Sequence, residues 1–282
     1  MPKIYEMVNL KEDPFRISPD PKYFYPTTNH DDALQRLYLS IENREGLNLI
    51  YGDYGTGKST MVEIIQTRYG GRDDFIVGKM ATAKARSDLQ FYLLIIQAFN
   101  IKLEGRTTLA ARNALEAFAL EKNLAENKTV ILIIDEGEAL TPTSIDLLRM
   151  MLNFESTDRK FFQMVVFGQL ELLSKIRKRR NFVDRISMSY VLNPLSMPQM
   201  KSMIEYRLTI AGLNGNIKLI EDDAYETIYR YTRGFPRQTV MLCNEALKTC
   251  VLDGSFVITK EIVTYHGESQ KKLYGERKIR NI

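Results

Sequence analysis

The stretch GDYGTGKST, residues 52–60, lies between the apolar run LNLIY and the segment MVEIIQTRY. It satisfies the pattern G-x-x-x-x-G-K-[ST], with Gly52, Gly57, Lys58 and Ser59 at the required places. In this pattern the glycines let a loop fold back so that its amides point at phosphate oxygens, and the next helix adds the positive end of its dipole. The sequence therefore predicts a nucleotide-binding loop over residues 52–60.

The residues of this loop have different expected tasks. Lys58 would neutralise the β- and γ-phosphate oxygens, and Ser59 would hold Mg²⁺. The other residues expected at the nucleotide are Gly52, Asp53, Tyr54, Gly55, Thr56, Gly57 and Thr60. The alternative is a glycine turn with a solvent-exposed lysine, which explains neither the flanking apolar segments nor the spacing.

A second segment, VILIIDEGEAL at 130–140, is an apolar run that ends in two adjacent acids, Asp135 and Glu136. Open parallel sheets bind their ligands at the carboxyl ends of the strands, where these acids would lie. Asp135 is expected to approach the metal, and Glu136 to orient or deprotonate the attacking water. Together with the loop at 52–60, the pair predicts a site for a nucleoside triphosphate with Mg²⁺.

Apolar strand-like runs alternate with helical patterns over most of the chain. The expected strands are at 47–52, 74–80, 129–135, 161–169 and 187–195, and the expected helices between them at 58–69, 87–99, 108–126 and 143–155. This alternation predicts an α/β fold with a parallel five-stranded sheet covered by helices on both faces.

The strands stop near Asn193 and Pro194. Ser196 is expected to cap a helix that has Pro198 in its first turn and ends near Gly212. Further helices are expected at 221–232, 235–252 and 259–269. The predicted organisation is an extended segment at 1–30, an α/β nucleotide-binding domain at 31–193, a small all-α domain at 194–266 and a basic tail at 267–282.

Composition limits the other possibilities. No apolar stretch is long enough to cross a bilayer, and the first residues lack a secretory signal, so a cytoplasmic location is the default. Two histidines and two cysteines offer little for zinc, and Cys243 and Cys250 are expected to be reduced thiols on one buried face. The net charge of +4 is concentrated at 175–182 and 271–281, which could contact phosphates or an acidic partner, or form solvated surface.

The pairing of GDYGTGKST with ILIIDEGEAL resembles the AAA+ ATPases, and among them the ExeA/GspA group associated with type II secretion and pilus biogenesis. Further stretches carry this resemblance, which covers residues 13–266: DPFRISPDPKYFYPTTNHDDALQRL, LLRMMLNFES, VVFGQLEL, DRISMSYVLNPLS and TRGFPRQTVMLCNEAL. It implies ATP as the nucleotide and the helical domain as a lid. The family usually reads D-E-A-Q where this chain has DEGE, which puts an amide role for Gly137 or Glu138 in doubt.

The resemblance implies roles for three more residues. Gln169 matches a polar sensor of the γ-phosphate or its water, the alternative being a surface glutamine that opens a turn. Arg185 matches an arginine that reaches a neighbouring subunit's nucleotide, with Arg180 as a substitute and an intramolecular salt bridge as the alternative. Arg237 matches a second sensor that couples hydrolysis to domain motion, the alternative being a surface charge at a helix start.

The N-terminal aromatic segment has two interpretations. In this family it lies near the nucleotide base, so its side chains could form an adenine wall, or the segment could cover a sheet edge. The residues concerned are Pro14, Phe15, Pro19, Pro21, Phe24 and Tyr25, followed by His30, which is not expected to act as a base.

Three functions compete. The first is a cytoplasmic ATPase of secretin or pilus assembly, as the ExeA/GspA resemblance implies. The second is a transposition regulator like the MuB and TnsC-type proteins, which assemble on double-stranded DNA with ATP. The third is a nucleotide-gated switch with little turnover, which the two intact acids argue against. The expected partners are further copies of the chain, in a ring or filament with nucleotide at the interfaces, together with a protein of secretion, pilus or transposition complexes.

Overall fold

The computed structural model describes residues 3–157, 159–215 and 217–274 of the 282-residue chain. The chain divides into two compact units. The α/β unit consists of Thr28–Tyr54 and Lys58–Leu192, and the helical unit of the described residues within Met1–Thr27, Gly55–Gly57 and Asn193–Ile282.

The α/β unit is built on one parallel sheet of five strands in the order β2-β3-β4-β1-β5. The strands are β1 (Leu47–Gly52), β2 (Phe75–Met80), β3 (Thr129–Ile134), β4 (Phe162–Gly168) and β5 (Ile186–Leu192). Every residue of β3 and β4 is buried, as expected for central strands of a parallel sheet. The predicted five-stranded parallel sheet is confirmed.

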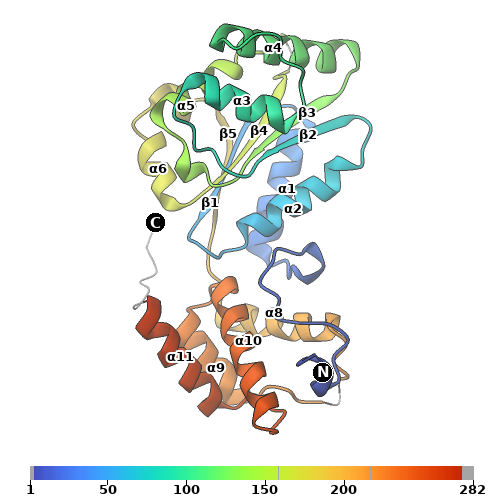
Figure 1. Ribbon diagram of the computed structural model, residues 1–282, viewed down its shortest axis with the longest axis vertical. Helices are drawn as coiled ribbons and strands as arrows, with labels where there is room; N and C mark the ends of the chain where they lie inside the picture. Colours follow the sequence, from blue (N-terminus) through green and yellow to red (C-terminus); the bar gives the residue numbers. More distant parts are fainter. Residues whose placement is uncertain (1–2, 158, 216, 275–282) are drawn as a thin grey trace. The chain divides into compact units, whose positions relative to one another are not determined.

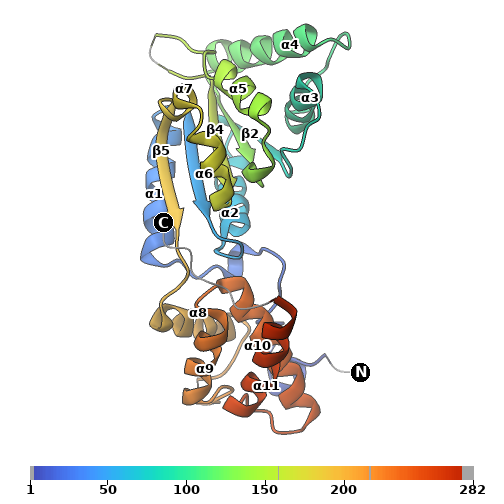
Figure 2. The ribbon, with the colours of Figure 1, turned by 90° about the vertical axis from the view of Figure 1, so that its left-hand side faces the viewer.

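Helices cover both faces of this sheet (Figures 1 and 2). One face carries α1 (Thr28–Glu42) and α2 (Lys58–Gly70). The other carries α3 (Asp88–Ala98), α4 (Thr108–Leu120), α5 (Pro142–Met151), α6 (Leu170–Ile176) and α7 (Arg180–Val183). Val130, Leu132 and Ile134 point into this second layer, and each fully buried side chain of this kind stabilises the fold by about 1.5–3 kcal/mol.

Some local elements were missed by sequence patterns. Helix α1 was not predicted, although its buried Ala33, Leu34, Leu37 and Ile41 follow helical spacing. The short helices α6 and α7 were also missed. The predicted helix at 108–126 is present as α4 and a π-helical turn at Glu121–Ala125. Three 3₁₀ turns complete the description: η1 (Glu6–Val8), η2 (Pro21–Tyr23) and η4 (Gly137–Ala139).

The C-terminal part of the helical unit contains α8 (Met197–Ile210), α9 (Asp222–Thr232), α10 (Pro236–Leu252) and α11 (Lys260–Tyr274). Ser196 caps α8 as predicted: its hydroxyl accepts from the Gln199 amide, and the Gln199 side chain accepts from the Ser196 amide. Residues 267–274 of the predicted basic tail belong to α11, and residues 275–282 lie outside the described residues.

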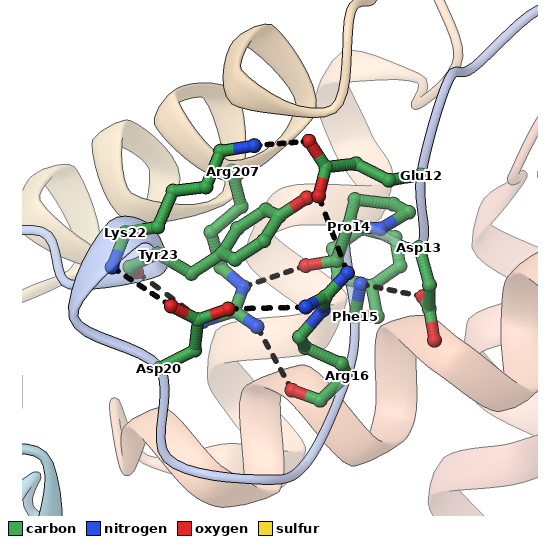
Figure 3. Close-up of polar contacts among 9 residues, drawn as sticks. All are labelled: Glu12, Asp13, Pro14, Phe15, Arg16, Asp20, Lys22, Tyr23 and Arg207. Atoms are coloured by element: carbon green, nitrogen blue, oxygen red, sulfur yellow. Dashed lines mark hydrogen bonds and ion pairs between the residues drawn. The ribbon is translucent and has the colours of Figure 1, made fainter.

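The N-terminal segment is tied to α8 by a buried arginine (Figure 3). The Arg207 side chain donates to three backbone carbonyls, those of Pro14 at 2.7 Å, Arg16 at 2.9 Å and Tyr23 at 3.3 Å. Its guanidinium lies 4.9 Å from the centre of the Tyr23 ring, a cation–π distance. Because Phe15 and Tyr23 are buried in the core of this unit, the segment is part of the unit's packing.

Ion pairs enclose the same segment. Arg16 pairs with Glu12 at 3.2 Å and with Asp20 at 3.0 Å, and Lys22 also pairs with Glu12. Burial, followed by the nearby Glu12, raises the pKa of the Tyr23 hydroxyl to about 12. Such partly exposed pairs contribute little stability each, so the three carbonyl bonds of Arg207 are the main polar tie.

The two cysteines are buried and unbonded, as expected. Both lie in the core of the helical unit on α10, and burial raises the pKa of Cys243 to about 12 and that of Cys250 to about 11. No helix within the described ranges is long and apolar enough to span a membrane.

Candidate functional site

The predicted phosphate loop joins the end of β1 to the start of α2. Its backbone takes the left-handed region at two positions, Gly55 with φ of 86° and Gly57 with φ of 101°. Side chains rarely adopt such angles, so glycine is needed at both. Within the loop Gly52 and Thr56 are buried, whereas Tyr54 and Ser59 are exposed. The result is a turn of backbone amides that ends at a helix N-terminus, the form that binds phosphate in other proteins.

Lys58 is the first residue of α2 and turns back over the loop. Its amine donates to the Gly52 carbonyl at 2.7 Å and to the Asp53 carbonyl at 2.8 Å. Burial is the largest influence on its pKa and lowers it, whereas the charges of Glu138 and Asp135 oppose this shift. The Lys58 amine therefore lies close enough to Glu138 and Asp135 for their negative charges to raise its pKa.

The acids follow β3 directly. The Asp135 amide continues the sheet pairing by donating to the Met80 carbonyl at 3.0 Å, and the Asp135 carboxylate accepts from the Glu136 amide at 3.0 Å. Glu136 is exposed, and its backbone is in the left-handed helical region, with φ of 54° and ψ of 45°. That backbone costs a non-glycine residue about 1–2 kcal/mol. Strain of this kind is often found at functional sites, so it makes Glu136 a candidate for chemistry.

The turn η4 begins immediately afterwards and packs tightly against β4. A side chain at Gly137 would place its Cβ 2.7 Å from Val166 Cγ1 and 2.9 Å from the Phe167 carbonyl oxygen. The glycine of DEGE is therefore required by close packing here. Glu138 follows and accepts from the Gln169 side-chain amide at 2.7 Å and from the Gln169 backbone amide at 3.0 Å.

Gln169 follows β4 and is the residue before α6. Gly52, Asp135 and Gln169 lie at the carboxyl ends of β1, β3 and β4, which are neighbouring or next-neighbouring strands in one parallel sheet. The structure thus brings the phosphate loop, the acids and Gln169 to one edge of the sheet. The roles assigned to them stay predictions.

Arg185 is at the opposite edge, immediately before β5. This strand has seven residues, which at the rise of an extended strand corresponds to about 20 Å. Burial, followed by the charge of Arg185, lowers the pKa of Lys160, whose side chain is ion-paired with Glu155. Among the described residues neither Arg185 nor Arg180 forms an ion pair, which removes the support for the salt-bridge alternative there.

The remaining predicted residues belong to the helical unit. Arg237 is the second residue of α10, behind Phe235 and Pro236. Pro14 and Phe15 are buried in this unit, whereas Phe24 and Tyr25 are partly exposed and Pro19 and Pro21 are exposed. His30, by contrast, is a buried residue of α1. The roles of Arg237 and of the aromatic segment at the nucleotide stay predictions.

Sequence reasoning did not assign a role to Glu138 or Lys175. The Lys175 amine donates to the Glu138 and Leu140 carbonyls and so fixes η4 to α6. These contacts join residues more than thirty positions apart in the chain. No local pattern signals such a pairing, apart from the departure of DEGE from the usual family motif.

Comparisons with known proteins agree with this geometry. A family model described as an AAA domain matches residues 41–176. The chain is 29% identical over 280 residues to General secretion pathway protein A of Aeromonas hydrophila, an alignment that covers 98% of this chain and 49% of that protein. The chain therefore spans about half the length of this relative.

Solved structures share the fold at lower identity. Cdc6p from Pyrobaculum aerophilum superposes with a TM-score of 0.70 at 16% identity, covering 95% of this chain and 73% of that one. The ORC2 protein of Aeropyrum pernix superposes with a TM-score of 0.66 at 14% identity, covering 92% and 75%. At these identities the likeness shows the fold.

The sheet, the phosphate loop and these matches define the class of fold: the chain has the AAA+ P-loop fold, and residues 41–176 match an AAA domain. Along nearly its whole length the chain is similar to General secretion pathway protein A, which confirms the predicted resemblance to the ExeA/GspA group.

Proposed function

We propose that this chain binds ATP with Mg²⁺, hydrolyses it, and uses the cycle to assemble or remodel a partner complex. The observation that carries the proposal is the placement of the glycine-rich loop, with Lys58 donating to its Gly52 and Asp53 carbonyls, at the carboxyl edge of the sheet where Asp135 and Glu136 follow β3. A glycine turn without a ligand would be expected to leave its lysine exposed to solvent, whereas Lys58 is half-buried.

The residues divide the work as follows. The Lys58 amine would exchange the Gly52 and Asp53 carbonyls for phosphate oxygens, which form stronger, charge-assisted bonds. The loop amides would bind the remaining oxygens. Ser59 and Asp135 supply the hard oxygen donors that Mg²⁺ prefers, and a site made of few protein ligands, water and phosphate is usual for this ion. When bound, Mg²⁺ would neutralise phosphate charge and orient the phosphates.

Glu136 would accept a proton from the attacking water. Its exposure leaves the carboxylate accessible, and its left-handed backbone directs it differently from the preceding strand residues. Gln169, held at the same sheet edge, would hydrogen-bond the γ-phosphate or the water.

We further propose that the active form is an oligomer in which Arg185 acts on a neighbouring copy. Arg185 and its own phosphate loop are at opposite ends of the parallel sheet, too far apart for contact within the α/β unit. A second copy that presents its Arg185 to the carboxyl edge would supply the positive charge that stabilises the transferring phosphoryl group.

The partner process we propose is secretion or pilus assembly in the cytoplasm. Support comes from the similarity to General secretion pathway protein A, which favours this role over a transposition regulator. The partner itself would be a protein of such an assembly.

Replacement of Glu136 with glutamine tests the hydrolytic assignment. The Glu136→Gln variant should bind ATP as the unmodified chain does and lose most hydrolysis, by about 10²-fold or more, because only the proton acceptor is lost. Full turnover by this variant would overturn the assignment. Lys58→Ala is the companion variant and should bind ATP at least about tenfold more weakly, because it loses a charge-assisted contact to phosphate.

A mixing experiment tests the shared site. Arg185→Ala and Glu136→Gln subunits are each expected to be inactive alone, and mixing should restore part of the activity where an intact Arg185 meets an intact Glu136. No recovery at any ratio, with mixed oligomers demonstrated by labelled subunits, would contradict an interface role for Arg185.

A further inference from the structure

Glu138 uses both of its carboxylate oxygens on one residue. Oε1 accepts from Gln169 Nε2 at 2.7 Å, and Oε2 accepts from the Gln169 backbone amide at 3.0 Å. Hydrogen bonds to a carboxylate are shorter and stronger than those between neutral groups. The side chain and the backbone of Gln169 are therefore held by the same acid.

The acid itself is fixed in place. Gly137 lies against β4 so closely that a Cβ would overlap Val166, and the Lys175 amine bonds the carbonyls of Glu138 and Leu140 on either side of the turn. Both Glu138 and Gln169 are only partly exposed. A pair held in this way lacks the freedom of a surface ion pair, so its geometry is retained.

This contact determines which way the Gln169 carboxamide is turned. A charged carboxylate only accepts hydrogen bonds, so the nitrogen must face Glu138 and the oxygen must face away from it. One N–H of the amide is used, which leaves Oε1 and the second N–H for other partners. Without Glu138 the amide would be able to flip and to exchange donor for acceptor.

The same carboxylate also contributes charge to the site. It is the largest electrostatic influence on the Lys58 pKa, ahead of Asp135, and acts against the lowering by burial. A negative charge here favours the protonated lysine and opposes a bound polyphosphate. Its removal should therefore leave nucleotide affinity unchanged or slightly increased.

We propose that Glu138 is a positioning residue for ATP hydrolysis, which holds the Gln169 carboxamide in one orientation at the phosphate-loop edge. The inference depends on the proposed ATPase function, because it assigns Glu138 a part in that reaction. It acts through Gln169 and touches neither substrate nor metal.

The experiment compares four forms of the full chain: unmodified, Glu138→Ala, Gln169→Ala and the double variant. Glu138→Ala should lower kcat by about 10- to 100-fold, the range expected when a reacting geometry is loosened. Its dissociation constant for a fluorescent ATP analogue should stay within about threefold of the unmodified value or decrease, because binding contacts are intact. In the Gln169→Ala background the same substitution should change kcat by less than about twofold, since it acts through Gln169.

Glu171→Gln is the matched control. The Glu171 carboxylate also raises the Lys58 pKa. Glu171→Gln therefore removes a negative charge that acts on Lys58 and leaves the Glu138–Gln169 contact in place. It should keep kcat within about twofold of the unmodified chain. Glu138→Gln serves if the alanine variant does not fold, and it should also lower kcat because a glutamine cannot accept with both of its terminal atoms.

A readout that needs no turnover separates this inference from the proposed function. In an NMR spectrum of the full chain, the Gln169 Nε2 proton that donates to Glu138 should be shifted downfield and exchange slowly with water, and both properties should be lost in Glu138→Ala. Absence of hydrolysis by the unmodified chain would refute the ATPase proposal and with it a catalytic use of Glu138, whatever the NMR result. Normal kcat in folded Glu138→Ala, or an undiminished effect in the Gln169→Ala background, would overturn the positioning role alone.

Discussion

Replacement of Arg207 with alanine should cost the protein about 3–5 kcal/mol of unfolding free energy. Three carbonyls, those of Pro14, Arg16 and Tyr23, would lose their donor. A buried acceptor left without a partner costs about 1–3 kcal/mol, and the charge-assisted bonds made here are stronger than neutral ones. The alanine variant no longer carries the desolvation cost of the buried guanidinium, a cost that also lowers the pKa of Arg207. The net loss of unfolding free energy is therefore smaller than the summed cost of three unsatisfied carbonyls.

Urea unfolding followed by far-UV circular dichroism would measure the change, since the chain has no tryptophan. Arg207→Lys should cost less than the alanine variant, because an ammonium group keeps the charge and some of the donors. Lys218→Ala is the surface control: its ion pair with Asp222 is exposed, and its loss should cost less than about 1 kcal/mol. Hydrogen exchange would localise the effect, with faster exchange expected for amides of α8.

An Arg207→Ala protein as stable as the Lys218→Ala protein would refute this reasoning. Such a result would mean that water satisfies the three carbonyls, and that the N-terminal segment is held to α8 by its apolar side chains alone.

Three further predictions concern stability. Gly234→Ala should lower the free energy of unfolding, measured in urea, by at least about 2 kcal/mol more than Gly254→Ala. Both glycines have positive φ, but only at Gly234 would a Cβ overlap a backbone oxygen, that of Leu195 at 1.9 Å. Equal losses of stability in the two variants would contradict this steric explanation. Glu136→Gly should be more stable than Glu136→Ala by about 1 kcal/mol, owing to the left-handed backbone, and the reverse order would exclude that strain. Burial lowers the pKa of His266 in the folded chain below its ordinary 6.5, so the unfolded chain takes up the proton at a higher pH. The free energy of unfolding should therefore fall as the pH drops below about 6.5. His266→Gln should reduce this pH dependence, and an unchanged slope of stability against pH would contradict the role of His266.

Much of the fold was predictable from the sequence because each strand is a short apolar run. β3 and β4 are buried on both faces, so their composition identifies them without alternation. The cap of α8 was equally clear, since Ser196 and Pro198 act locally. Helix α1 was missed because its apolar stripe is narrow among polar and charged residues.

The placement of the candidate site residues was predictable where it depends on local spacing. The loop around Lys58 and the acids after β3 each form one continuous motif. The contact between Glu138 and Gln169 was not predictable, because it depends on how η4 packs against β4, and that in turn on a glycine at position 137. The tie between Arg207 and the N-terminal segment joins residues about 190 positions apart, and is likewise a product of the tertiary fold.

Isothermal calorimetry of ATP with Mg²⁺ on the folded chain tests the central claim most directly. We expect one nucleotide bound per chain, and an affinity at least about tenfold lower for Lys58→Ala, since that variant loses a charge-assisted contact to phosphate. If the folded, unmodified chain takes up no ATP, or if Lys58→Ala binds it equally well, the nucleotide site described here is wrong.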